Sequence, residues 1–425
     1  MSESSCLACC VSAAPPSSPE QSASAKRSHE WLILAILSLL MAFASISTDL
    51  YLPALPAMAQ SLHAEHGAVE FTISSYLIGF SLGQLVWGTV SDRFGRRLPV
   101  AIGLVLFIIG SAGCALSSTI GALITWRSIQ AVGACASVVL SRAMVRDLYA
   151  GHRAAQMLST LITVMAVAPL VGPSVGGFIL TLTSWRAIFR VLVVVGAVTL
   201  LSLHFLPETL PQHRRREDRL GSALKAYVHL LRDRRLIAYA AAGAFFYAGV
   251  YAYIAGTPFA FMTYYHVSPQ VYGILFAAGI LGIMLTNQIN GRLVMRHGSD
   301  ALLRAGAIGA VVAAAWLVVD VSTGWGGLAG LVAPLFVFVA GNGFIVANSI
   351  GGALSVFPER AGAVSALTGA MQYGSGILSS GLVGLLADGT PRPMAWIIAV
   401  CAVGCIVSVR NLAREATRIP ARATN

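Results

Sequence analysis

The chain runs Gly88-Thr-Val-Ser-Asp92-Arg93-Phe-Gly95-Arg96-Arg97 between two long apolar segments. Such a short, charged connection predicts a tight turn at a membrane surface, with its arginines on the cytoplasmic side. Gly88 and Gly95 are expected to let two helix ends approach closely and to let the chain turn. Asp92 is expected to cap a neighbouring helix N-terminus, and the arginines to bind helix C-terminal carbonyls. We call this stretch the latch, because it is predicted to hold helices together.

Composition gives the class of the whole chain. Of its 425 residues, 56% are hydrophobic and 11% are charged, whereas soluble domains average about 25% charged residues. The chain is therefore predicted to be an integral membrane protein, with the lipid bilayer as its surroundings. The sequence lacks the alternating ten-residue strands of an outer-membrane barrel, which favours an all-α fold.

Twelve apolar segments are close to the ~20 residues that a helix needs to cross a bilayer. They are Leu32–Leu55, Val69–Val90, Leu98–Leu116, Ile120–Leu140, Met157–Leu180, Ala187–Leu206, Leu236–Met262, Val271–Leu293, Leu302–Val319, Gly326–Ala347, Val364–Leu386 and Met394–Leu412. The predicted fold is thus a bundle of 12 transmembrane helices.

The basic residues predict the orientation of these helices. With the N-terminus inside, 24 of the 28 Lys and Arg residues fall in cytoplasmic segments, two in outer loops and two within spans. This bias predicts that both termini are cytoplasmic. The net charge of +11 is accordingly an orientation signal, and no nucleic-acid partner is expected.

The widest gap between apolar segments divides the chain into two similar halves. Three latch residues recur in the second half at a constant offset of 203, although Met295 stands where Asp92 stands in the first. The recurring residues are Gly88, Arg93 and Gly95, which correspond to Gly291, Arg296 and Gly298. Two six-helix repeats around a site at the membrane midplane are typical of secondary transporters.

The expected domain organisation follows from this division. It comprises a disordered cytoplasmic tail (1–30), an N-terminal six-helix bundle (31–206), a cytoplasmic linker (207–235), a C-terminal six-helix bundle (236–412) and a cytoplasmic tail (413–425). Cys6, Cys9 and Cys10 lie in the first tail without further ligands at metal-binding spacing, so no metal site is expected there.

Several motifs resemble those of one transporter family, in the correct order. They are Asp49-Leu-Tyr-Leu-Pro-Ala-Leu-Pro56, the latch, Arg127-Ser-Ile-Gln130-Ala-Val-Gly133, Arg146-Asp147-Leu-Tyr149, Gly172-Pro173-Ser-Val-Gly176-Gly177 and Trp185-Arg186-Ala-Ile-Phe189. From Trp31 to Leu412 the chain resembles the 12-span drug:proton antiporters of the major facilitator superfamily, specifically the bicyclomycin and chloramphenicol resistance (Bcr/CflA) family. The resemblance implies a multidrug efflux transporter of the bacterial inner membrane that exchanges small drugs for protons. We further expect a monomer without a cofactor.

Asp49 and Arg127 are the candidate proton-coupling residues. Asp49 precedes the Pro53 break of the first span, and Arg127 lies at a comparable depth in the fourth. A carboxylate inside a bilayer is costly and therefore marks a functional site. The matching depth predicts an ion pair, direct or through water. Two other interpretations remain open: Asp49 as an interfacial cap, and Arg127 extending outward to the membrane surface.

Neutral polar residues of the second half are candidates for a drug-binding wall. They are Tyr247, Tyr251, Asn287, Asn290, Asn342 and Gln372. The alternative for the polar ones is that they join helices to one another through hydrogen bonds. Asp320 and Asp388 lie at the outer ends of their spans and are expected to be solvated.

The fifth span carries the antiporter motif Gly172, Pro173, Gly176 and Gly177. Pro169 and Pro173 each remove a backbone donor and bend a helix, and the glycines suit close packing against another helix. In the family this forms a sealed, bendable interface with the other half; an ordinary kinked helix is the alternative.

An enzymatic function is not expected. The sequence has no Gly-x-x-x-x-Gly-Lys phosphate loop and no His-Glu-x-x-His pair, so transport would draw on an ion gradient. Two alternatives to drug efflux remain open. One is proton-coupled transport of a metabolite such as an amino acid or a sugar, and the other is a membrane receptor that transports nothing.

Overall fold

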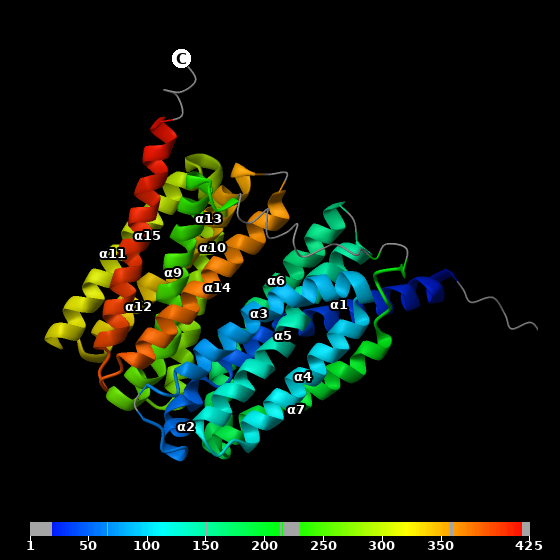
Figure 1. Ribbon diagram of the computed structural model, residues 1–425, viewed down its shortest axis with the longest axis horizontal. Coiled ribbons are helices and arrows are strands. Elements are labelled where there is room, and N and C mark those ends of the chain that lie inside the picture. The colour runs from blue at the N-terminus through cyan, green and yellow to red at the C-terminus, as the bar shows by residue number, and fades with distance from the viewer. Residues whose placement is uncertain are drawn as a thin grey trace, which may run out of the picture.

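A computed structural model describes residues 19–65, 67–149, 151–212, 215, 230–357 and 360–418. Within these ranges the chain forms helices joined by short turns, and no strand occurs (Figure 1). The predicted all-α fold is confirmed.

Among the residues that the structure describes, the first half contains six long helices and several short ones. Their bounds are α1 (Pro19–Asp49), η1 (Leu52–Ala54), α2 (Leu55–Ser61), α3 (Phe71–Phe94), α4 (Arg97–Leu116), α5 (Ile120–Leu148), α6 (Gly151–Leu182), α7 (Trp185–Ser202) and η2 (Leu203–Phe205). Thr119 starts α5, since its side chain accepts a hydrogen bond from the backbone of Ala122.

The second half repeats this pattern. Its elements are α9 (Arg234–Pro258), the π-helical η4 (Phe259–Tyr264), α10 (Pro269–His297), α11 (Ser299–Thr323), α12 (Gly327–Ala340), α13 (Asn342–Val356), α14 (Ala361–Leu385) and α15 (Arg392–Arg418). Asp233 and Ser268 cap α9 and α10 with their side chains. A break at Gly341 separates α12 from α13, which together form the tenth predicted span.

Each of the twelve predicted spans corresponds to a helix or a helix pair, but α14 differs from the others. In the described part of the chain, 11 segments are long and apolar enough to cross a membrane, and α14 is not among them. Its 25 residues suffice to span the bilayer. Gly, Ser and Gln372 lower its hydropathy, and it packs between α9 and α3. A helix face that packs on other helices does not require an apolar surface.

The predicted tails and linker overlap only partly with the described residues. α1 begins at Pro19, inside the segment that was expected to be disordered. The cysteines of the first tail and most of the linker lie outside the described residues, and α15 ends at Arg418.

Figure 1 shows the two halves side by side, with α1 to α7 (blue to green) in one bundle and α9 to α15 (green to red) in the other. Within the first bundle α5 packs against α3 and α4, and within the second α9 packs against α14 and α15. The halves meet mainly where α6 packs on α10 and where α3 packs on α14.

These contacts concentrate at one end of the molecule, which we call the closed end. Ser74, near the start of α3, is hydrogen-bonded to Ser380, near the end of α14, at 2.8 Å. A Cβ at Gly177, near the end of α6, would lie 2.7 Å from the carbonyl oxygen of Pro269, at the start of α10. The latch is at the other end of α3, so it lies away from the contacts that close the molecule.

Candidate functional site

The latch is mostly helical. Its first seven residues form the last two turns of α3, and only Gly95 and Arg96 separate α3 from α4. Gly95 has a φ of 90°, a conformation that glycine adopts without strain, and the predicted tight turn is found. A Cβ at Gly88 would meet nothing within 4 Å. The close helix approach expected at Gly88 is therefore not found there.

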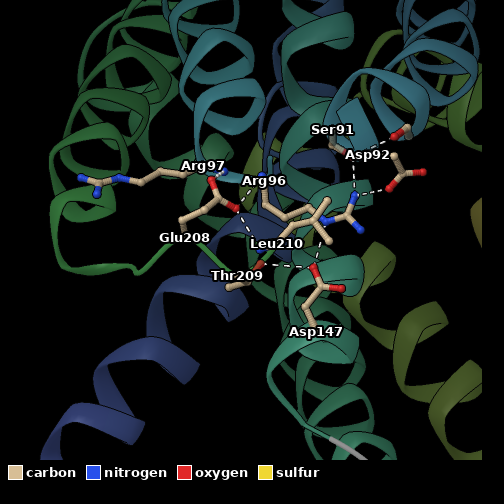
Figure 2. Close-up of polar contacts among 9 residues, drawn as sticks. Ser91, Asp92, Arg96, Arg97, Asp147, Glu208, Thr209 and Leu210 are labelled. Atoms are coloured by element: carbon tan, nitrogen blue, oxygen red, sulfur yellow. Dashed lines mark hydrogen bonds and ion pairs between the residues drawn. The ribbon is translucent and has the colours of Figure 1, made fainter. Parts of the chain in front are cut away.

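Arg96 is at the centre of the latch (Figure 2). Its guanidinium donates hydrogen bonds to Asp92 Oδ1 and Ser91 Oγ, both at 2.6 Å, and to Asp147 Oδ2 at 2.9 Å. Burial alone would lower the pKa of this group, but the hydrogen bonds and charges of Asp147 and Asp92 raise it. Arg96 thereby joins the end of α3 to the end of α5 as a permanent cation.

Glu208 caps the helix that follows the turn (Figure 2). Its carboxylate accepts hydrogen bonds from the backbone N–H groups of Arg96 at 2.8 Å and Arg97 at 3.1 Å, and from that of Leu210 at 3.0 Å. Partial burial alone would raise the pKa of Glu208, but these N–H donors outweigh it and lower the pKa. The segment after α7 is thus fastened to the N-terminus of α4.

The latch therefore differs from its prediction in its partners. Asp92 binds the Arg96 side chain, whereas it was expected to cap a neighbouring helix, because Arg96 lies one turn away and reaches it first. Arg93 lies over the ring of Phe94 at 5.6 Å. In the described residues, the hydrogen-bond partners of Arg96 and Glu208 belong to the first half or to the start of the linker, and none belongs to the second half.

A second candidate site is a cavity of about 230 Å³ between the two halves. Both halves contribute to its wall. The lining residues are Ser45, Thr48, Asp49, Tyr51, Leu52, Ile73, Tyr76, Leu77, Met165 and Pro169 of the first half, with Tyr247, Val250, Tyr251, Ile254, Phe276, Ile280, Asn342 and Tyr373 of the second. The wall is mainly apolar and aromatic, with a few polar groups, as is usual for sites that bind small molecules.

Asp49 is the acidic residue in the wall of this cavity. It is the last residue of α1, just before a turn that contains Pro53. The side chain is 6% exposed, and Thr48 Oγ1 donates a hydrogen bond to it at 3.3 Å. The structure thus places a buried carboxylate where a ligand in the cavity would meet it.

Arg127 is fully buried, but it forms no ion pair with Asp49 in the described structure. Its guanidinium donates to the carbonyl oxygen of Ser47 at 3.1 Å and to Gln130 Oε1. It also lies 4.1 Å from the ring centroid of Tyr51 and 4.4 Å from that of Tyr76. Two aromatic faces and the last turn of α1 hold the cation, so the alternative of an outward-extending Arg127 does not fit.

Phenol rings form the opposite wall of the cavity. The ring centroid of Tyr373 lies 6.5 Å from that of Tyr247 and 6.4 Å from that of Tyr251. The Phe80 ring of the first half completes the cluster, 5.3 Å from Tyr373. Of the six predicted wall residues, Tyr247, Tyr251 and Asn342 line this cavity.

The other predicted wall residues lie elsewhere. Asn290 accepts a hydrogen bond of 2.6 Å from the side chain of Asn348, and so it joins α10 to α13. Asn287 is exposed, and Gln372 is buried beside Gly243. The alternative of hydrogen bonds that join helices fits Asn290.

The antiporter motif packs against both halves. A Cβ at Gly172 would lie 3.1 Å from the Cβ of Asp49, and one at Gly176 would clash with the carbonyl oxygen of Leu50. Gly177 instead faces Pro269 of the second half. Pro169 and Pro173 both lie inside α6, which continues through them. The motif therefore contacts the end of α1, next to the cavity, as well as the closed end.

Sequence reasoning did not assign roles to several residues of these sites. Asp147 was noted only within a family motif, Glu208 follows a predicted span, and Tyr373 lies in α14, which is not among the segments apolar enough to cross a membrane. A search for acidic residues in the Arg-rich segments would have found Asp147 and Glu208. Asp320 was expected to be solvated, which is wrong. It is buried, and Oδ1 accepts a hydrogen bond of 2.8 Å from the backbone of Gly326.

Known proteins resemble the chain along most of its length. The family description "Major Facilitator Superfamily" matches residues 37–380. An uncharacterized MFS-type transporter, YdgK, of Bacillus subtilis is 38% identical over 91% of this chain and 96% of the relative. A chloramphenicol resistance protein of Pseudomonas aeruginosa is 32% identical over 84% of each chain. A bicyclomycin resistance protein homolog of Haemophilus influenzae is 28% identical over 88% of this chain and 93% of the relative.

A solved structure has the same fold. The xylose transporter XylE of Escherichia coli, in a partially occluded inward open conformation, matches with a TM-score of 0.69. The match covers 89% of this chain and 97% of that one at 17% identity.

Proposed function

Because the chain belongs to the Major Facilitator Superfamily and its relatives support the bicyclomycin and chloramphenicol resistance group, we propose that it exports small drugs by proton antiport. Relatives named for resistance to chloramphenicol and bicyclomycin support compounds of these classes as substrates. It is a non-enzymatic membrane transporter. We assign it to the bacterial inner membrane as a monomer, and the distribution of its basic residues supports cytoplasmic termini.

The observation that carries the proposal is the position of Asp49. A carboxylate that is 6% exposed lines the cavity between the halves, and no cation pairs with it in the described residues. An ionisable side chain inside a membrane protein and beside a cavity is a candidate for a proton-transfer site. Asp49 is thus the group for which a proton and a drug would compete.

Arg127 is proposed to position Asp49 and not to neutralise it. The guanidinium holds the carbonyl oxygen of Ser47, which lies in the same helical turn as Asp49. Drug binding against Tyr51 and Tyr76, which line the cavity and contact Arg127, would disturb this turn. Movement of the Tyr51 and Tyr76 rings on drug binding would thereby shift Asp49. This shift would favour release of the proton from Asp49.

The conformation fits the inward-facing state of a transporter that alternates between two openings. With the termini in the cytoplasm, the closed end faces outward, and the latch lies at the inner end. Separation of the latch from the second half is then expected in this state, because the inner end is open. Closing that end would bring Asp92, which is exposed here, close to the second half.

Drug-induced proton release from the purified protein in weak buffer tests the proposal. The wild type should release protons when a phenicol compound is added, whereas Asp49→Asn should bind the compound and release none. Asp388→Asn is the matched control, because Asp388 is exposed, lies in the turn between α14 and α15, and does not line the cavity. In cells, expression should lower drug accumulation, and a protonophore should remove the difference. Equal proton release from wild type and Asp49→Asn contradicts the role of Asp49; drug export that needs ATP at a constant proton gradient contradicts antiport.

A further inference from the structure

Glu70 is an acidic residue buried between the two halves, away from the drug cavity. It directly precedes the membrane-spanning segment Phe71–Phe94 and is 3% exposed. A Cβ on Gly384 of α14 would lie 3.2 Å from the Cβ of Glu70. Beside it, a side chain at Gly67 would clash with the backbone of Gly384. The start of α3 thus packs directly on the end of α14.

Glu70 faces a separate cavity of about 140 Å³ at the closed end. Its lining comes from the second half, except for Gly67 and Glu70 themselves. The residues of the second half are Gly256, Phe259, Ala260, Thr263, Tyr264, Val383, Ala387, Gly389, Thr390, Pro391, Pro393 and Met394. Glu70 therefore extends from one half into a mainly apolar wall of the other.

The charged and titratable groups around Glu70 leave its carboxyl unpaired. Oε2 is buried without a hydrogen-bond partner, and neither ion pair found in the described residues involves Glu70. From η4, Tyr264 lines the cavity. From the turn before α15, Asp388 binds Thr390 and Arg392 is exposed. On its own segment Glu65 is exposed, and His66 lies outside the described residues.

Burial without a partner favours the protonated carboxyl. It raises the pKa of Glu70 to about 7, although a backbone N–H bond opposes the shift. A carboxyl exposed to water has a pKa of about 4.3. The closed end therefore binds this proton more tightly than an open end would, provided that opening exposes Glu70 to water.

We propose that Glu70 is a second proton-binding site, which favours closure of the outer end when its carboxyl is protonated and favours opening when it is ionised. The site differs from Asp49 in that it meets water only from the outside. It cannot carry a proton across the membrane, because it stays buried, 3% exposed, while the inner end is open. Its role is to make the balance between the two states depend on external pH.

The direction of the dependence follows from linkage. Since the pKa is higher in the closed form, the closed form is favoured fully below about pH 4.3, and this advantage disappears as the pH rises through about 7. Between about pH 6 and about pH 8 the ratio of open to closed outer ends should rise about tenfold. The proposal needs alternating closure, but it needs neither drug nor proton exchange at Asp49.

Cysteine labelling from the outside tests the proposal in the full-length protein. In a variant that lacks the seven native cysteines, Ser380→Cys places a thiol in the closed contact with Ser74. A membrane-impermeant maleimide should label it about tenfold faster at about pH 8 than at about pH 6, after correction for thiol ionisation with an exposed control cysteine. Glu70→Gln, which keeps the shape of the neutral form, should label slowly at both pH values.

Two further variants separate the possible causes. Glu65→Gln removes a neighbouring exposed carboxylate and should retain the full pH response. The pH dependence of labelling should also persist in Asp49→Asn. Failure of the proposed drug coupling at Asp49 would therefore leave the proposal for Glu70 unaffected. Labelling of the Ser380→Cys protein that is independent of pH, or an unchanged response in Glu70→Gln, would overturn the proposal. If Glu70→Gln does not fold, Glu70→Asp should move the midpoint of the response, and an unmoved midpoint would equally overturn it.

Discussion

The two halves of the molecule build the same turn with different chemistry. Gly95 and Gly298 occupy equivalent positions and have similar φ angles, 90° and 77°. In the first half the turn is surrounded by the Arg96 and Glu208 bonds (Figure 2). In the second half Met295 replaces Asp92 and is 86% exposed. The backbone geometry is thus retained where the charged network is not.

At the equivalent turn of the second half, an acidic residue binds a tyrosine and not an arginine. Asp300, which is at the position equivalent to Arg97, accepts a hydrogen bond from the Tyr239 hydroxyl and so fastens the start of α11 to α9. Arg296 corresponds to Arg93, and both are exposed, whereas Ser299 stands in place of the buried Arg96. A repeated sequence pattern therefore predicts a repeated turn, but it does not predict which residues stabilise that turn.

The largest expected difference between the halves is at their arginines. Arg96→Ala removes three side-chain hydrogen bonds and leaves Asp147 partly buried without its cation. It should destabilise the protein by about 2–4 kcal/mol. The second half has Ser299 in place of Arg96, and Arg296→Ala, at an exposed position equivalent to Arg93, should change stability by less than about 0.5 kcal/mol. Thermal unfolding of both variants in detergent checks this prediction. Similar losses of stability would show that both turns depend equally on these arginines.

A smaller, pH-dependent effect is expected at Glu208. Its pKa is lowered in the folded protein, so its contribution is present above its usual pKa of about 4.3 and is lost as the pH falls through the lowered folded value. Glu208→Gln should lose up to about 1 kcal/mol at neutral pH, because a cap residue contributes about this much and solvent screens an exposed one. When unfolding is measured from neutral to acidic pH, the difference in stability between Glu208→Gln and the wild type should decrease. A stability difference that increases in acid contradicts this account.

The smallest effect is expected when one latch residue is transferred to the second half. Met295→Asp restores the acidic residue, but the position equivalent to Arg96 is Ser299. Without a cation to bind, the new carboxylate should change stability by less than about 0.5 kcal/mol. Adding Ser299→Arg supplies the cation, so comparing the single and double variants by thermal unfolding measures any coupling. A stabilisation above about 1 kcal/mol from Met295→Asp alone would mean that another cation reaches this position.

The sequence predicted the helices well because their signal is local. Apolar length and loop charge indicated each span, and Gly95 indicated the turn. α14 was found by length, although Gln372 and its glycines reduce its hydropathy. Its polarity results from packing between α9 and α3, which a single sequence does not reveal.

The sites were predicted less completely because their contacts join distant segments. Depth along the spans placed Asp49 and Arg127 at a similar level, but it could not show that Tyr51 and Tyr76 enclose the guanidinium. Glu208 is more than a hundred residues from the turn that it caps. The burial of Asp320 depends on the backbone of Gly326, which hydropathy does not describe.

The contact between α6 and α10 has a consequence for the speed of opening. Gly177 faces the backbone of Pro269, and Gly273 faces that of Ser174. Glycines have no side-chain rotamers, and parting them leaves few long side chains to rearrange. The side-chain conformational entropy should therefore change little when α6 separates from α10. The contribution of this contact to the activation free energy of opening should accordingly depend only weakly on temperature.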